Sequence, residues 1–100
     1  MKVIRLFCTH GFSTNMLRNK MEEAAKKMNL DYKIEAFPYS EVIDKGKDSD
    51  VILLGPQIRY NLKHVQKKYP DKTVLLLDME NYAKMNGEAA INQVKIALGD

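Results

Sequence analysis

Short apolar runs of strand length alternate along this chain with segments of helical spacing, and this alternation restricts the possible folds more than any other feature. Val3–Phe7 is broken only by one arginine, and Val51–Leu54 is continuous and ends in Gly-Pro. A continuous apolar run bounded by turn residues is typical of a parallel strand buried on both faces. We therefore place Val51–Leu54 in the centre of a sheet. Further strands are predicted at Tyr32–Phe37, from its alternation, and at Thr73–Leu77, as another buried strand.

The segments between these runs have apolar residues at helical spacing. Helices are predicted at about residues 14–28, 57–68 and 90–98. A weaker signal at Ser40 and Glu41 predicts the start of a further, short helix. Ser13 and Thr14 are the candidate N-caps of the first helix. Four strands joined by helical crossovers imply a parallel sheet covered on both sides. We predict an α/β fold, a four-stranded parallel sheet in a doubly wound, flavodoxin-like arrangement.

Size and composition restrict the class of protein. The 100 residues are about one ordinary domain, so residues 1–100 are expected to form a single domain. No apolar run has the length of a membrane span or signal peptide, and a lone cysteine excludes an internal disulfide, so a cytoplasmic protein with a reduced thiol is expected. The net charge of +3 comes from scattered lysines, which favours solvated surface over nucleic-acid binding.

Ligands of doubly wound folds bind beyond the carboxyl ends of the strands. Three loops lie there: Cys8–Thr14, Gly55–Gln57 and Asp78–Gly87. The first combines a thiol at a strand end with a glycine and hydroxyls at a helix start, which is typical of an anion cradle. The field of a helix N-terminus also lowers the pKa of a cysteine thiol. We therefore predict that Cys8 is a nucleophile at neutral pH.

The cysteine, the two histidines and Phe12 also have plainer interpretations. Cys8 can instead be a small buried hydrophobic residue of the first strand. His10 is interpreted as a solvated residue or an added partial charge rather than a catalyst, and His64 as a surface residue. Phe12 can contact a partner or pack inward. One cysteine and two histidines form no visible metal cluster, and no cofactor is implied.

The methionines, among them Met16, Met21 and Met28, fall largely at helical spacing. Their flexible, apolar side chains fill gaps in protein cores. We therefore interpret them as core residues of the first helix rather than as a binding surface.

Four motifs together carry a family resemblance. They are LFCTHGFSTNML, KMEEAAKKMNLDYKIEA, SDVILLGPQIRY and DMENYAKMNG. The chain resembles, nearly end to end, the enzyme IIB component of the lactose/cellobiose (chitobiose) family of bacterial sugar phosphotransferase systems.

This resemblance implies a phosphoryl carrier, and so an enzyme, a protein-phosphocysteine sugar phosphotransferase. The carrier would accept a phosphoryl group from a phosphohistidine of enzyme IIA, hold it on Cys8, and pass it to a sugar bound by the membrane enzyme IIC. The sugar would be of the cellobiose, lactose or chitobiose type, and a monomer is the default assumption. By position, the resemblance implies that a phosphate-binding loop follows the first strand and that a second group of residues borders the phosphate site. The loop comprises Thr9, His10, Gly11, Phe12, Ser13, Thr14 and Asn15, and the border Gly55, Pro56, Gln57 and Tyr82.

The chain departs from the family pattern at several positions. Family loops usually have a small residue at His10, methionine at Phe12 and serine at Asn15, and the late motif usually has Gly and Asp where Ala83 and Asn86 stand. The nucleophile and the loop glycine are kept. Transfer chemistry is therefore expected, and the differences would act on partner recognition and loop geometry.

Three rival functions remain open. A low-molecular-weight phosphatase has a similar loop but needs an arginine six residues after the cysteine, where this chain has Thr14. A thiol redox protein needs a resolving cysteine, where this chain has Gly11. A regulatory module would have Cys8 merely packed, and would keep its activity in Cys8→Ala.

Overall fold

The computed structural model describes residues 1–9 and 11–100, and of residues 11–13 it describes the backbone. Eleven elements follow one another along the chain. They are β1 Lys2–Cys8, α1 Gly11–Lys27, β2 Tyr32–Pro38, η1 Tyr39–Glu41, α2 Val42–Lys45, β3 Val51–Leu54, η2 Pro56–Asn61, α3 Leu62–Lys68, β4 Thr73–Leu76, α4 Met79–Ala83 and α5 Gly87–Leu98.

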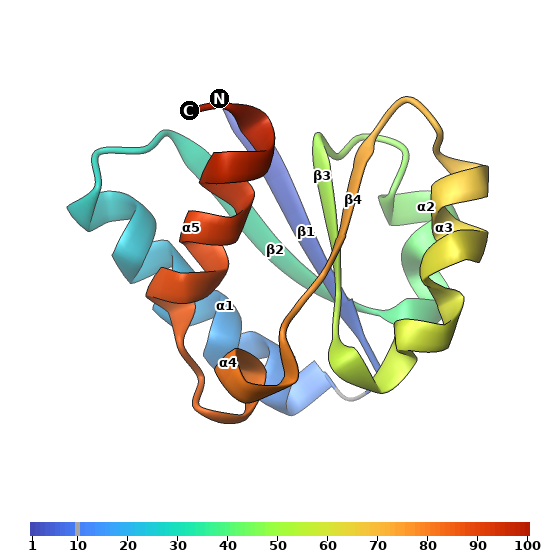
Figure 1. Ribbon diagram of the computed structural model, residues 1–100, viewed down its shortest axis with the longest axis horizontal. Coiled ribbons are helices and arrows are strands. Elements are labelled where there is room, and N and C mark those ends of the chain that lie inside the picture. The colour runs from blue at the N-terminus through green and yellow to red at the C-terminus, as the bar shows by residue number, and fades with distance from the viewer. Residues whose placement is uncertain (10) are drawn as a thin grey trace.

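The four strands form one parallel sheet in the order β2-β1-β3-β4 (Figure 1). This order confirms the predicted doubly wound α/β fold, because the chain moves outward from β1 to β2 and then returns across β1 to β3 and β4. The reversal lies between β1 and β3, whose carboxyl ends are Cys8 and Leu54. Ligands of such sheets bind at that switch point.

Helices cover both faces of the sheet (Figure 1). On one face α1 and α5 pack against Ile4, Leu6 and Cys8 of β1. On the other, η2, α2 and α3 pack against side chains such as Phe7 and Ile52. The two-residue period of β1 therefore directs Cys8 toward α1 and α5.

The prediction for the last strand needs adjustment in its limit and in its burial. The last strand ends at Leu76 rather than Leu77, and it lies at the sheet edge, where most of its side chains are only half-buried. An edge strand has one neighbour, so only its inner side is fully covered. The prediction that Val51–Leu54 lies inside the sheet is confirmed, because all four residues are buried.

The helix predicted at residues 57–68 is in fact two elements. The 3₁₀ helix η2 precedes α3, and Ile58 within it has non-helical φ and ψ of −114° and 26°. Pro56 fixes the first turn, and the irregular backbone at Ile58 places this apolar side chain in the core, 5% exposed. Apolar spacing alone does not distinguish such a turn from an α-helix.

The prediction of core methionines is only partly right. Met21 is fully buried and Met28 is partly buried against the core. Met16 is 52% exposed, because it precedes the inward-facing Leu17 and points to the other side of α1.

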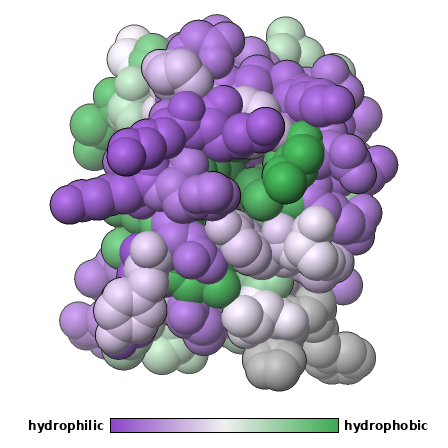
Figure 2. Space-filling view, turned by 90° about the vertical axis from the view of Figure 1, so that its right-hand side faces the viewer, coloured by the Kyte–Doolittle hydropathy of each residue, from purple (hydrophilic) through white to green (hydrophobic). Residues whose placement is uncertain are grey.

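The face that carries α3 is mostly hydrophilic, with small separate apolar patches (Figure 2).

Candidate functional site

Cys8 lies at the carboxyl end of β1 and is 1% exposed. Thr9 follows as an exposed residue, and α1 begins at Gly11. The first four backbone N–H groups of a helix have no partner within the helix, and they carry about half a positive elementary charge. The thiol thus immediately precedes a helix N-terminus, where an anion is stabilised.

The first helix starts one turn earlier than its apolar spacing predicted. Ser13 and Thr14 were candidate N-caps, but both lie inside the first turn of α1, so this prediction is wrong. The Thr14 side chain is fully buried and forms a hydrogen bond with Tyr82 instead of capping the helix. Residues 11–14 of the expected loop of residues 8–14 are therefore helical.

Some predicted site residues lie outside this description. The predictions for His10, and for the side chains of Phe12 and Ser13, fall on parts of the chain that the structure does not describe. Asn15 is exposed on α1, and its place in the site stays a prediction from the sequence.

The ends of three strands meet at the thiol. Cys8 Sγ donates a hydrogen bond to Gln57 Oε1 at 3.3 Å and contacts Tyr82 Oη, also at 3.3 Å. Gln57 follows β3, and Tyr82 lies on α4, after β4. The structure thus brings together residues from all three loops expected at the carboxyl edge. Cys8 is buried, as its plainer interpretation requires, yet it also has polar partners.

Gly55 leaves the space in which these groups meet. A Cβ on Gly55 would lie 2.8 Å from Gln57 Oε1 and 3.2 Å from Cys8 Sγ. Its φ of −65° suits any residue, so the constraint is steric and not conformational. The Gly55 N–H also donates to Phe7 O at 2.9 Å, which ties the end of β3 to that of β1. Gly55 therefore shapes both the turn and the surroundings of the thiol, while Pro56 is buried at the start of η2.

Tyr82, whose hydroxyl contacts the thiol, is itself buried, at 7% exposed. Burial raises the pKa of Tyr82, and the hydrogen bond with Cys8 raises it further, while hydrogen bonds with Thr14 and Gln57 act in the opposite direction. The phenol therefore stays protonated at neutral pH. Cys8, Thr14, Gln57 and Tyr82 form one hydrogen-bonded group, which we call the thiol cluster.

The helix that carries Tyr82 was missed by sequence reasoning, which expected a loop from Asp78 to Gly87. The short helix α4 occupies its first half, and Asp78 Oδ2 accepts from the Asn81 N–H at 3.2 Å. Asp78 at the N-cap was the available signal. At its other end, Met85 has a φ of 53°, a left-handed conformation in which glycine is the usual residue. The C-terminal signal was therefore absent.

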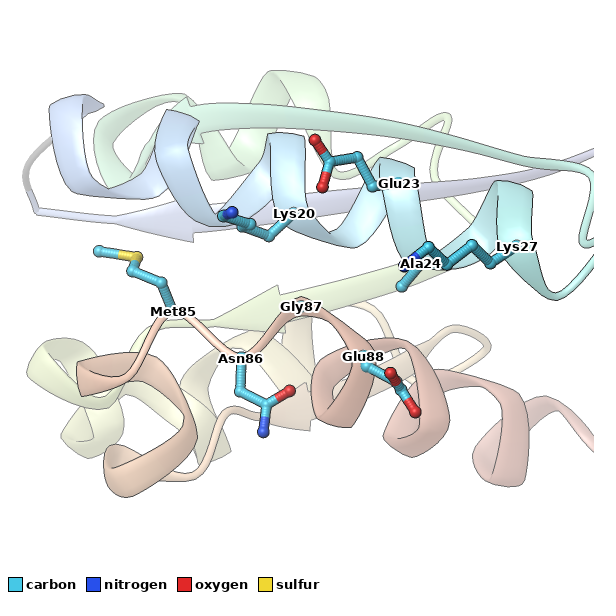
Figure 3. Close-up of a pocket in the computed structure, with 8 residues that line it drawn as sticks. All are labelled: Lys20, Glu23, Ala24, Lys27, Met85, Asn86, Gly87 and Glu88. Carbon is cyan, nitrogen blue, oxygen red and sulfur yellow. The ribbon is translucent and has the colours of Figure 1, made fainter.

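The remaining candidate features lie away from the thiol. His64 is exposed on α3, in agreement with its interpretation as a surface residue. A groove of about 220 Å³ lies between α1 and the start of α5 (Figure 3). Its lining comprises Lys20, Glu23, Ala24, Lys27, Met85, Asn86, Gly87 and Glu88, none of them a member of the thiol cluster.

Metal-binding groups and membrane-spanning helices are both absent from residues 1–9 and 11–100. No three His, Cys, Asp or Glu side chains there are grouped so that they could hold a metal ion. No helix in that part of the chain has the length and apolar character needed to cross a membrane.

Comparison with known proteins was made on sequence and on structure. A family model described as "PTS system, Lactose/Cellobiose specific IIB subunit" matches residues 3–93. The galactose-specific EIIB component of Lactococcus lactis is 35% identical over 97 residues, which cover 90% of each chain. A longer relative, the lactose-specific EIICB component of Staphylococcus epidermidis, is 28% identical over 96 residues, only 16% of its length.

Two solved structures are similar over almost the whole chain. The cellobiose-specific IIB component of Borrelia burgdorferi has a TM-score of 0.77 at 32% identity and covers 96% of this chain and 90% of its own. The lactose-specific IIB domain of Streptococcus pneumoniae has a TM-score of 0.84 and covers 96% of both chains; at 16% identity it supports the fold alone. Family model, relatives and fold agree, and the chain belongs to the lactose/cellobiose-specific IIB subunits of the phosphotransferase system, the phosphoryl carriers of sugar uptake.

Proposed function

We propose that Cys8 is the residue on which this carrier holds its phosphoryl group. The observation that carries the proposal is the position of the thiol, which ends β1 directly before α1 and contacts both Gln57 and Tyr82 at 3.3 Å. The phosphoryl donor is a phosphohistidine of an enzyme IIA, and the acceptor is a sugar bound by a membrane enzyme IIC.

The transfer balances without any further reactant. The bond between the histidine nitrogen and phosphorus breaks as the bond between Cys8 Sγ and phosphorus forms. The thiol proton is lost, and the histidine nitrogen that releases the phosphoryl group takes up a proton. The second transfer forms a phosphorus–oxygen bond to a sugar hydroxyl, whose proton replaces the phosphoryl group on sulfur.

Two kinds of hydrogen-bond donor support the proposed phosphoryl position. The backbone N–H groups of the first turn of α1, residues 11–14, begin three positions after Cys8. The hydroxyls of Thr14 and Tyr82 belong to the thiol cluster. Because phosphoryl transfer depends mainly on positioning and on stabilising the peripheral oxygens, such donors suffice for the chemistry. Thr9, His10, Ser13 and Asn15 complete the proposed phosphate-binding segment by sequence position.

Retention of the phosphoryl group is as important to a carrier as its acceptance. In a low-molecular-weight phosphatase an arginine clamps the transition state, whereas position 14 here is a buried threonine. One hydroxyl replaces a bidentate cation, which favours slow hydrolysis and therefore transfer to a second protein.

The biological setting forms part of the same proposal. Residues 1–100 act as one IIB domain, as a cytoplasmic monomer without nucleic-acid partners. The sugar is of the lactose/cellobiose class, since the similar proteins are named for galactose and cellobiose. Enzyme IIC as a partner is supported by the longer relative, an EIICB component whose sequence includes a segment similar to this chain.

The proposal is tested by intact mass. Wild type and Cys8→Ser are incubated with phosphoenolpyruvate, the general phosphotransfer proteins and several lactose/cellobiose-type enzyme IIA proteins. We expect a gain of one phosphoryl group in wild type alone. No gain with any enzyme IIA would refute the carrier role of Cys8, and rapid Cys8-dependent turnover of an aryl phosphate would favour the phosphatase instead.

A further inference from the structure

The side-chain amide of Gln57 has two chemically opposite ends within reach of the thiol. Its Oε1 accepts from Cys8 Sγ at 3.3 Å, and the amide also forms a hydrogen bond with Tyr82. Gln57 is exposed although Cys8 is buried, so its amide can turn without displacing packed side chains. The amide carbonyl only accepts hydrogen bonds, and the amide NH₂ only donates them.

Loading the carrier inverts what its sulfur presents to Gln57. The free thiol is a donor and is matched by Oε1. Once the S–P bond has formed, the sulfur has no proton, and the phosphoryl oxygens are acceptors. If Oε1 faced the phosphoryl oxygens, two acceptors would meet with no hydrogen between them. Neither would then have a hydrogen-bond partner, which is unfavourable, above all for the charged phosphoryl group.

We propose that Gln57 is a positioning residue whose amide reverses with the state of the carrier, with Oε1 toward the free thiol and Nε2 toward the phosphoryl group. This inference rests on the proposed role of Cys8 and extends it. A half-turn about the Cγ–Cδ bond exchanges the two ends and needs no backbone movement. The Tyr82 hydroxyl accommodates the loss of the thiol proton by rotating its own hydrogen, because either the oxygen or the sulfur can be the donor in the contact of Tyr82 with Cys8.

Gly55 makes the reversal sterically possible. The Gln57 amide lies close to Gly55, since a Cβ on Gly55 would be only 2.8 Å from Gln57 Oε1. The absence of a Cβ leaves both ends of the amide free to approach the sulfur. An alanine at this position would therefore push the amide away from the sulfur, and with it whichever end faces Cys8.

The first test measures how phosphoryl groups partition. Purified phosphorylated enzyme IIA is mixed in equal amount with each IIB variant, and intact mass gives the phosphorylated fraction at equilibrium. Gln57→Glu keeps the acceptor and loses the donor, and Gln57→Met loses both. We expect the partition constant to fall about tenfold in Gln57→Glu, the equivalent of one hydrogen bond to a charged group. In Gln57→Met it should fall only about threefold, because the free thiol loses its acceptor as well. Gln66→Glu, the same charge change on an exposed α3 residue, is the matched control and should not change it.

The second test observes the amide itself. In ¹⁵N-labelled wild type, the Gln57 side-chain NH₂ resonances should shift on phosphorylation, and those of Gln66 should not. Unchanged Gln57 resonances, or Gln57→Met partitioning as wild type does, would overturn the reversal while the carrier role of Cys8 stands. If wild type itself gained no phosphoryl group, the role of Cys8 and the reversal would both fall.

Discussion

At the scale of single residues, the thiol of Cys8 combines burial with polar contact. Sequence reasoning treated a buried cysteine and a reactive one as alternatives, whereas the structure has a thiol that is 1% exposed and still has hydrogen-bond partners. Burial removes competing water, and the partners hold the sulfur in a defined direction. Burial and polar contact are therefore combined at this thiol, as the carrier role proposed for Cys8 requires.

Removal of the Tyr82 hydroxyl tests its part in this arrangement. In Tyr82→Phe we expect phosphorylation from enzyme IIA to slow about tenfold, because the phosphoryl oxygens lose one hydrogen-bond donor worth roughly 1.5 kcal/mol. The rate is measured by rapid quench and intact mass. Tyr60→Phe is the matched control, because Tyr60 is 81% exposed and its hydroxyl binds Arg59. An unchanged rate in Tyr82→Phe would remove Tyr82 from the transfer site.

At the scale of elements, α5 lies unusually close to α1. A Cβ on Gly87, the first residue of α5, would lie 2.5 Å from both the carbonyl oxygen of Lys20 and the amide nitrogen of Met21. The preceding Asn86 caps α5, and its Oδ1 accepts from the Ala89 N–H at 3.0 Å. Asparagine thus performs the capping that the more usual aspartate of the family would provide, which explains how the chain tolerates that departure.

Gly87→Ala is expected to destabilise the fold. Alanine normally stabilises a helix relative to glycine by about 1 kcal/mol. Here the atoms that a methyl group would meet are backbone atoms of α1, so the two helices must move apart, at a cost of about 1–3 kcal/mol. Urea unfolding measures the net change in the free energy of unfolding. An increase in stability would show that the close approach of α1 and α5 is not required.

At the scale of the whole molecule, four tyrosines link stability to pH. Burial is the largest cause of a raised pKa for Tyr32, Tyr39, Tyr69 and Tyr82 alike. Tyr32 also binds Asp100, and Tyr69 lies near the charge of Asp44. Their ordinary pKa is about 10. Above that pH the unfolded chain loses these protons while the folded protein keeps them, so the unfolded state is favoured.

The free energy of unfolding should therefore be insensitive to these groups below pH 9 and fall as pH rises through 10 and above. Urea unfolding between pH 8 and 11 gives the dependence, and absorbance at 295 nm follows tyrosinate formation. In the folded protein the four tyrosines should ionise at higher pH than in the unfolded chain. Ionisation of all of them near pH 10 without loss of structure would contradict this linkage.

Much of the sheet could be predicted from the sequence, because three strands are mainly apolar runs and Tyr32–Phe37 alternates in the two-residue period of a strand. Val51–Leu54 has the same limits in prediction and structure. Helix limits were harder to predict, since α1 begins at Gly11, a poor helix former, and Met85, shortly after the end of α4, has a conformation typical of glycine. The contact of Gln57 with Cys8 joins residues 49 apart in sequence, and no local pattern encodes it.

Both chain ends lie at the end of the sheet opposite the carboxyl end of β1, the strand that Cys8 terminates (Figure 1). Lys2 pairs with Tyr32, whose hydroxyl donates to Asp100 at 2.7 Å, so the first and last residues are held near one another. A polypeptide joined at either end would leave the thiol end uncovered. The same unit can therefore operate free or tethered to a larger protein, as in the EIICB relative, and a tether would raise its effective concentration beside a joined partner without changing the reactive end.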